Sequence, residues 1–132
     1  MSEAYSAKVM DHVRNPRNVG SLEDANVVVQ VGDPVCGDAL VFFIKIEEEI
    51  VTDVKFLIKG CGAAIATSSV ATELVLGRTL DEVLALDEQG IADALGGLPE
   101  AKMHCSNMAA GALHAAVQQY RDTVAGKVAA VG

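Results

Sequence analysis

The sequence contains no run of about 18 consecutive apolar residues, the length that a helix needs to cross a bilayer. Its first residues, MSEAYSAKVMDHVRNPRN, lack the basic start and apolar core of a signal peptide. No low-complexity tract, internal repeat or linker divides the 132 residues, and this length is typical of one domain. We therefore expect a cytoplasmic protein without a membrane partner, in which residues 1–132 form a single domain.

Basic side chains are also scarce. The chain has 10 Lys and Arg against 18 Asp and Glu, which gives a formal net charge of -8. This charge would repel a polyanion such as DNA or RNA, so nucleic acid is excluded as a partner. Apolar residues make up 51% of the chain and charged residues 21%, a balance that is typical of a globular protein.

Cysteine is rare as well, with three residues at positions 36, 61 and 105. An odd number of widely spaced cysteines, in a chain without an export signal, indicates reduced thiols rather than a disulfide framework. Each cysteine taken alone also has a purely structural interpretation, because free cysteine often packs in a core as a small apolar residue.

Three runs of β-branched and aromatic residues predict strands, and apolar residues at helical spacing predict helices around them. We expect an α+β fold in which a three-stranded antiparallel sheet has helices packed on one face. The acidic run Glu47-Glu48-Glu49 is predicted to be a hairpin turn. The expected strands are 26–31, 39–47 and 50–58, and the expected helices are 3–14, 64–75, 79–86, 87–95 and a long helix from about 103 to 124.

Several residues mark the ends of these helices. Ser2 is the expected N-cap of the first helix, and Gly77 fits the C-cap of the helix that ends at 75. Thr79 and Glu82 have the spacing of a capping box. In the last helix the residues expected to face the core are Met108, Ala112, Leu113, Ala116, Tyr120 and Val124.

The three cysteines all lie at element ends in this arrangement. Cys36 lies in the loop between the first two strands, Cys61 follows the third strand, and Cys105 starts the last helix. Because the middle strand reverses direction, Cys36 and Cys61 are expected at the same end of the sheet. Flanking glycines allow close backbone approach, and the helix N-termini at Cys61 and Cys105 are expected to favour thiolate over thiol.

Two further side chains belong to this group. Asp38 is two residues beyond Cys36, so in an extended segment both side chains point the same way, and His104 directly precedes Cys105. Asp38 alone could instead stabilise a turn, and His104 alone could cap or pack, as we expect for His12 and His114. Together, three thiols with a carboxylate or an imidazole suit tetrahedral zinc or an iron-sulfur cluster.

A hypothesis without a metal is an enzyme with Cys105 as nucleophile and His104 as base. It is disfavoured because adjacent residues on a helix project about 100° apart, and the sequence offers no third group to orient the histidine.

Four stretches carry a family resemblance: AYSAKVMDHVRNPRNVG, GDPVCGDAL, FLIKGCGAAIATSS and KMHCS. They resemble the IscU/NifU-type scaffolds for iron-sulfur cluster assembly, and the likeness runs from Tyr5 to about Tyr120. It implies an IscU/SufE-like fold and a scaffold, not an enzyme. Such scaffolds receive persulfide sulfur from a pyridoxal-phosphate-dependent cysteine desulfurase, bind iron, build a [2Fe-2S] cluster and pass it to apo-proteins.

The resemblance also implies the site residues. Cys105 is expected to accept sulfur first, and Cys36 and Cys61 to hold the cluster. Asp38 is a harder oxygen donor that would leave the cluster transferable, while His104 is either a further ligand or a group that activates Cys105. The implied set for both cofactor and metal is Cys36, Asp38, Cys61, His104 and Cys105.

Ferredoxin and an Hsp70-type chaperone are further partners that the family implies. The chaperone segment of such scaffolds often reads Leu-Pro-Pro-Val-Lys, whereas residues 98–102 here read Leu-Pro-Glu-Ala-Lys, which weakens that prediction. The alternative is a zinc-dependent sulfur acceptor of SufU type, with zinc in the apo form. That branch typically lacks the histidine before the last cysteine and carries an insertion ahead of it, so His104 and the uninterrupted spacing point away from it.

Overall fold

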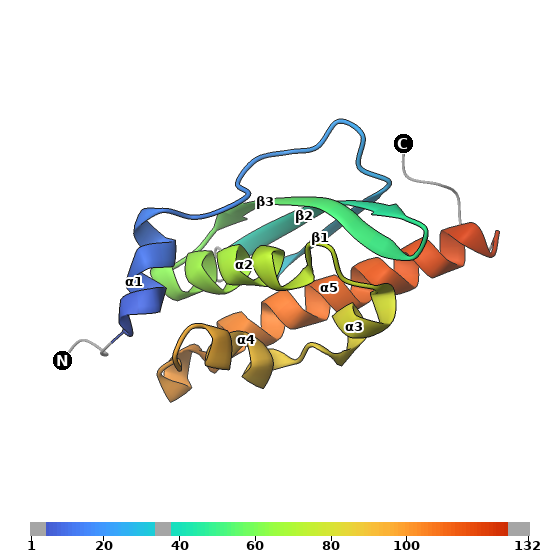
Figure 1. Cartoon of the computed structure of the whole chain (residues 1–132). Coiled ribbons are helices and arrows are strands. Elements are labelled where there is room, and N and C mark those ends of the chain that lie inside the picture. The colour runs from blue at the N-terminus through green and yellow to red at the C-terminus, as the bar shows by residue number, and fades with distance from the viewer. Residues whose placement is uncertain (1–4, 34–37, 127–132) are drawn as a thin grey trace.

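The computed structural model describes residues 5–33 and 38–126 of the chain. Its strands form one antiparallel sheet in the order β1-β2-β3, and the helices lie on one side of that sheet (Figure 1). The predicted α+β fold is therefore confirmed. In chain order the elements are α1 (Ala7–Arg14), β1 (Val27–Asp33), β2 (Asp38–Glu47), β3 (Ile50–Lys59), α2 (Gly62–Val75), α3 (Leu80–Ala85), α4 (Glu88–Ala94), the 3-10 turn η1 (Glu100–Lys102) and α5 (Met103–Val124).

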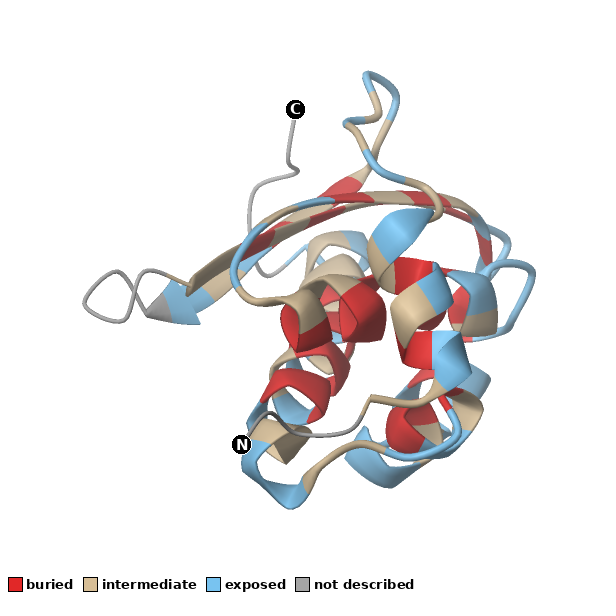
Figure 2. Cartoon of the chain, turned by 90° about the vertical axis from the view of Figure 1, so that its left-hand side faces the viewer, coloured by how far each residue is buried: buried red, intermediate tan, exposed pale blue. Residues whose placement is uncertain are grey.

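The core lies between the sheet and the helices beneath it, where the ribbon segments of buried residues face one another (Figure 2). Alternate residues of β2 point into it, as the period of two in a strand requires. Phe42 and Phe56 are paired across β2 and β3, fully buried, with ring centroids 6.4 Å apart. None of the helices in the described part of the chain is long and apolar enough to cross a membrane.

Helix α2 is central to the helical layer. Ten of its 14 residues are buried, on every side of the helix, as expected of a helix that is enclosed by neighbours. It contacts α1, α4, α5 and β3. Since α2 begins directly after Cys61, this enclosure fixes the position of the cysteine.

Helix α1 begins later than the sequence suggested. Its first residue is Ala7 and its N-cap is Ser6, whose Oγ accepts a hydrogen bond of 3.1 Å from the amide of Val9. The hydroxyl of Ser6 also donates to the carbonyl of Leu95, which holds the helix start against the end of α4. The predicted start at residue 3 is therefore wrong, and Ser2 lies outside the described residues.

Other local predictions are confirmed. Glu48 and Glu49 have φ of 52° and 64°, the left-handed values of a two-residue hairpin turn. Both hydrogen bonds of the capping box between Thr79 and Glu82 are present. Gly77 follows the end of α2 with φ of 82°, the conformation in which glycine ends helices.

The end of α5 differs from the prediction. Ala112, Leu113 and Ala116 are buried as expected, but Val124 is 69% exposed. Val124 is the last residue of α5, and the last turn of this helix extends past the sheet (Figure 1), so in the described part of the chain the sheet does not cover it. The helical spacing of apolar residues does not contain the length of the opposing sheet, which decides the burial of Val124.

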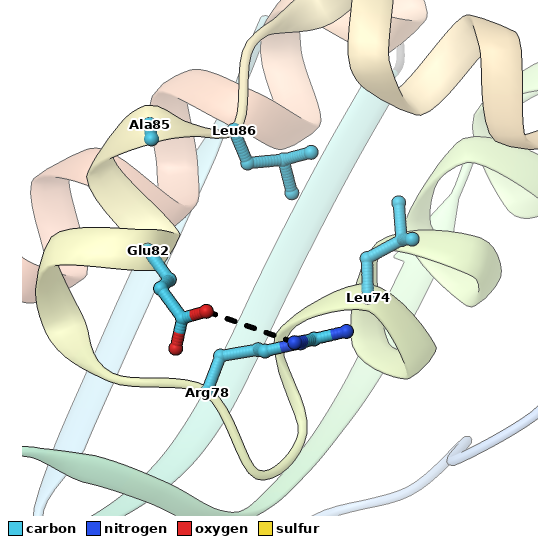
Figure 3. A pocket seen from close by; sticks show the side chains of 5 residues that line it. All are labelled: Leu74, Arg78, Glu82, Ala85 and Leu86. Atoms are coloured by element: carbon cyan, nitrogen blue, oxygen red, sulfur yellow. Dashed lines mark ion pairs between the residues drawn. The ribbon is translucent and has the colours of Figure 1, made fainter.

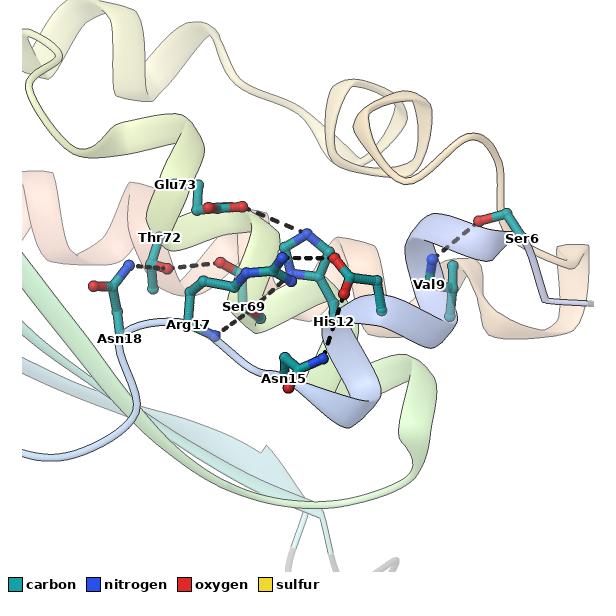
Figure 4. A network of polar contacts seen from close by, with 10 residues as sticks. Ser6, Val9, His12, Asn15, Arg17, Asn18, Ser69, Thr72 and Glu73 are labelled. Carbon is teal, nitrogen blue, oxygen red and sulfur yellow. Dashed lines mark hydrogen bonds and ion pairs between the residues drawn. The ribbon is translucent and has the colours of Figure 1, made fainter.

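A polar network joins α1 to α2 (Figure 4). The Oγ of Ser69 accepts from the amide of Arg17 at 2.8 Å and lies 2.7 Å from Nδ1 of His12. Nε2 of His12 lies 3.4 Å from the carboxylate of Glu73, which can only accept, so the ring proton of neutral His12 is on Nε2. Nδ1 is then the acceptor, and the hydroxyl of Ser69 donates to it. His12 is thus structural, as predicted, and so is His114, whose Nε2 donates to the carbonyl of Leu86 at 2.6 Å.

This network predicts that the protein loses stability as pH falls from 7 towards 5. Burial lowers the pKa of His12 below its ordinary 6.5, and the charge of Arg17 lowers it further, against the opposing effect of Glu73. The unfolded chain therefore binds a proton near pH 6.5 that folded His12 does not, and stability present above that pH is lost below it.

Urea unfolding at several pH values tests this prediction. His12→Gln is expected to cost about 1 kcal/mol at pH 7 through the lost hydrogen bonds, and its stability is expected to fall less steeply with acid. Parallel pH profiles for the variant and the wild type would contradict the assignment.

Candidate functional site

One end of the sheet brings the predicted site residues together. Asp33 and Asp38 are the last pair of β1 and β2, and Ala39 pairs with Lys59 near the end of β3. Asp38 and the residues that follow β3, including Cys61, therefore lie at the same end of the sheet. Cys36, which stands between Asp33 and Asp38 in the sequence, lies outside the described residues.

Two of the cysteines meet although 44 positions separate them. Cys61 is the N-cap residue of α2, Cys105 is in the first turn of α5, and their Sγ atoms are 3.8 Å apart. Cys105 is 1% exposed and packs with Ala63 and Ala64 in a small apolar cluster, and Cys61 is half-buried at its margin. The contact between α2 and α5 thus places two sulfurs side by side in an apolar setting.

His104 completes this arrangement from the same helix. Its Nδ1 lies 3.0 Å from the carbonyl of Ala101, and its Nε2 lies 3.5 Å from Sγ of Cys105. A carbonyl can only accept, so Nδ1 carries the proton and Nε2 has a free lone pair in the neutral ring. That lone pair faces Cys105, where it can accept a proton or bind a metal ion.

This contact corrects one step of the sequence argument. The divergence of adjacent residues on a helix was expected to keep His104 away from Cys105, and no orienting group was visible. In the structure the imidazole turns back to reach the sulfur, and the carbonyl of Ala101 orients it. A backbone carbonyl has no signal in the sequence, so this role could not be read from residue types.

Asp38 lies against the residue that precedes Cys61. A Cβ atom placed on Gly60 would be 3.3 Å from Oδ1 of Asp38 and 3.1 Å from Cβ of Ala64. The carboxylate therefore packs directly on the backbone of Gly60, in space that a side chain would occupy. The glycine beside Cys61, noted in the sequence as a sign of close approach, serves that purpose for Asp38.

The thiol of Cys105 is held in its neutral form. Burial raises its pKa from 9.0 to about 12, and the adjacent Cys61 and the charge of Asp38 raise it as well, while the charge of Lys102 opposes them. The expectation that the helix N-terminus favours thiolate is thus wrong for Cys105, because loss of water outweighs the helix dipole.

We predict that Cys105 is alkylated slowly by iodoacetamide at pH 8 and faster as pH rises. In Cys61→Ser the profile should move to lower pH, because the neighbouring sulfur no longer opposes the charge. Peptide mass spectrometry after timed alkylation measures the rate at Cys105 alone. Cys36→Ser is the control with the same substitution, and an unshifted profile in Cys61→Ser would contradict the prediction.

The donors have the chemistry of a soft-metal site. Two sulfurs, an imidazole nitrogen and a carboxylate lie at one end of the sheet, and thiolate and imidazole suit zinc, iron and iron-sulfur clusters. Within residues 5–33 and 38–126, no three His, Cys, Asp or Glu side chains are close enough together to hold a metal ion. Cys36, the third thiol of the predicted set, is not among those residues.

An open hollow of about 320 Å³ lies elsewhere, beside the far end of α2 (Figure 3). Its lining includes Leu74 and Leu86 and an ion pair of 3.6 Å between Arg78 and Glu82. Leu74 is 13 residues along the chain from Cys61, or about 20 Å along a helix. The hollow is thus separate from the sulfurs.

Comparison with known proteins shows which family the chain belongs to. The model for the NifU-like N terminal domain matches residues 4–127. The chain is 54% identical over 116 residues to the iron-sulfur cluster assembly scaffold protein IscU 1 of Archaeoglobus fulgidus, covering 88% of this chain and 76% of that protein. It is 50% identical over 122 residues to the scaffold protein IscU of Aquifex aeolicus, covering 91% and 78%.

A solved structure supports the fold alone. The crystal structure of a candidate SUF-system scaffold protein from Fervidobacterium islandicum superposes with a TM-score of 0.68 at 22% identity, covering 86% of this chain and 96% of that one. The family match spans nearly the whole chain and includes every residue of the candidate site. The chain therefore belongs to the NifU-like N-terminal domain family.

Proposed function

We propose that this protein is a scaffold on which an iron-sulfur cluster is built and from which the cluster passes to apo-proteins. The observation that carries the proposal is the meeting of Cys61, Cys105 and the free lone pair of His104 at one end of the sheet. The named function of the relatives with about half of their residues identical supports it. In the proposal the cluster is cargo, and residues 1–132 act as one scaffold domain.

In the proposal each residue has a role that follows from the chemistry of its side chain. Cys36, Cys61 and Cys105 supply thiolates, Asp38 supplies the harder oxygen donor, and His104 supplies Nε2. Binding of iron requires the thiol of Cys105 to lose its proton. Nε2 of His104 is placed either to take that proton or to bind the metal itself. The apolar cluster keeps this thiol neutral until a metal ion arrives, which is a reason to bury a ligand.

The finer assignments are a [2Fe-2S] cluster, iron binding, and Cys105 as first acceptor of persulfide sulfur. A pyridoxal-phosphate-dependent cysteine desulfurase would supply that sulfur, and ferredoxin is a further partner in the proposal. An Hsp70-type chaperone is the least supported partner, since Glu100 and Ala101 replace two residues of its segment. That segment adjoins the site, because the carbonyl of Ala101 orients His104.

Anaerobic incubation with a cysteine desulfurase, cysteine and ferrous iron tests the function. The protein is expected to gain the visible absorption and the Mössbauer signature of a [2Fe-2S] centre, and Cys61→Ser and Cys105→Ser are expected to lose most of it. Transfer to an apo-ferredoxin completes the test. Folded wild-type protein that stays colourless under these conditions would rule the function out.

Zinc-dependent sulfur acceptance is the second candidate, because two thiols, an imidazole and a carboxylate also suit tetrahedral zinc. It predicts stoichiometric zinc in the protein as purified, and sulfur acceptance that is lost on chelation and restored by zinc. Elemental analysis before and after chelation separates the two candidates.

A further inference from the structure

The sulfur pair of Cys61 and Cys105 is close enough to react. Their Sγ atoms are 3.8 Å apart, whereas the bond of a disulfide is about 2.05 Å, so the two atoms need to approach by less than about 2 Å. Cys105 packs in the apolar cluster with Ala63 and Ala64, and Nε2 of His104 lies 3.5 Å from its Sγ. The pair is thus arranged for chemistry between the two sulfurs, beyond the binding of metal.

Access to the two sulfurs is unequal. Cys105 is 1% exposed, so in this conformation an external reductant reaches its Sγ less readily than the neighbouring Cys61 does. Cys61 is half-buried and in contact with it. A sulfur atom carried on Cys105 therefore has one described thiol within reach, that of Cys61.

We propose that Cys61 is the resolving thiol that releases this sulfur as sulfide. The inference rests on the proposed function, which places persulfide on Cys105. Persulfide sulfur is at the oxidation level of the element, whereas the bridging atoms of a cluster are sulfide, so each sulfur must gain two electrons. The pair of thiols supplies both electrons.

The step balances as follows. Cys61 gives its proton to solvent water, and its thiolate attacks the inner sulfur of the Cys105 persulfide. A bond forms between the two cysteine sulfurs, the bond between the inner and outer sulfurs breaks, and the outer sulfur leaves as hydrosulfide with the electron pair. The two cysteine sulfurs are oxidised to a disulfide and the outer sulfur is reduced. A dithiol reductant then returns the disulfide to two thiols, which can act as ligands again.

Inorganic polysulfide is the probe that tests this step on the full chain. The reduced protein is treated anaerobically with polysulfide and rapidly desalted, and released sulfide is then trapped with monobromobimane. Intact mass follows the gain of one sulfur atom and then the loss of that sulfur together with two hydrogen atoms, and peptide mapping locates the disulfide. Wild type is expected to release about one sulfide per chain while a Cys61–Cys105 disulfide forms.

Cys61→Ser is expected to keep its persulfide and to release sulfide at least about 100-fold more slowly, because the neighbouring thiol acts at high effective concentration. Release at the wild-type rate in this variant overturns the proposal. So does release in wild type without a disulfide, or with a disulfide that includes Cys36, and these readouts do not depend on the folding of any variant. Reconstitution from ferrous iron and inorganic sulfide needs no persulfide, so its failure would count against the scaffold function and not against this step.

Discussion

Gly32→Ala is expected to lower the free energy of unfolding by about 3 kcal/mol or more, as backbone clashes of this kind do. Gly32 has φ of 143°, a conformation that other residues rarely adopt. A Cβ atom there would lie 2.3 Å from the carbonyl oxygen of Asp38 and 2.8 Å from Cα of Ala39. Both contacts are backbone, so no side chain can move aside, and the last pairs of β1 and β2 must separate.

The same change is expected to remove cluster loading. Asp38 is the first residue of β2 and packs on Gly60 beside Cys61, so displacing its backbone takes the carboxylate away from the sulfurs. Urea unfolding gives the stability, and reconstitution with iron and inorganic sulfide gives the loading.

Gly111→Ala is the matched control for this experiment. Gly111 is in α5 with open space around it, so alanine there should stabilise the protein by about 0.5–1 kcal/mol through helix propensity. Equal stability of Gly32→Ala and wild type would show that the ends of β1 and β2 tolerate the extra atom, contrary to the geometry.

The fold was largely predictable because its signals are local. Strand and helix periods in the sequence, the capping box of Thr79 and Glu82, and Gly77 after α2 each act within a few residues. The prediction of the first helix start was wrong because two residues there have the same local capping signal. Ser6 and Ser2 are equally good caps by type, and the contact of Ser6 with Leu95, 89 residues away, is a tertiary feature that the local pattern does not contain.

The proximity of Asp38 and Cys61 was predictable, whereas the electrostatics of Cys105 were not. A meander brings Asp38 and Cys61 to one end of the sheet by topology alone, so two residues far apart in sequence could be placed together. The state of Cys105 depends on how many apolar atoms enclose it, and that follows from the packing of α2 on α5. A helix N-terminus was visible in the sequence, but the loss of water that outweighs it was not.

The free lone pair of His104 changes how Asp38 should act. In the sequence the two residues were alternatives for one position, since both can complete a set of three thiols. The structure places Nε2 of His104 3.5 Å from Cys105 and the carboxylate of Asp38 against Gly60, on the side of Cys61. Asp38 and His104 are therefore expected to compete for one ligand position on the cluster. If one of the two side chains is removed, the other should occupy that ligand position.

Asp38→Ala is accordingly expected to hold the cluster longer and to slow its transfer to an apo-ferredoxin by about tenfold or more, the size of effect that ligand environments produce. Without the carboxylate, Nε2 of His104 can take the vacated position, and imidazole is a better donor for iron than a carboxylate oxygen. The Mössbauer spectrum should change at one iron. Asp24→Ala, at an exposed position in the loop between α1 and β1, is the control and should behave as wild type.

The double variant Asp38→Ala/His104→Ala separates this explanation from a general slowing of transfer. If His104 replaces Asp38, the double variant loses the longer lifetime and binds the cluster more weakly than either single variant, because only thiolates remain. If the lifetime of Asp38→Ala has another cause, such as reduced entry of water, removing His104 leaves it long. An unchanged spectrum and an unchanged transfer rate in Asp38→Ala would take Asp38 out of the ligand set, and the carboxylate on Gly60 would then serve only the charge around Cys105.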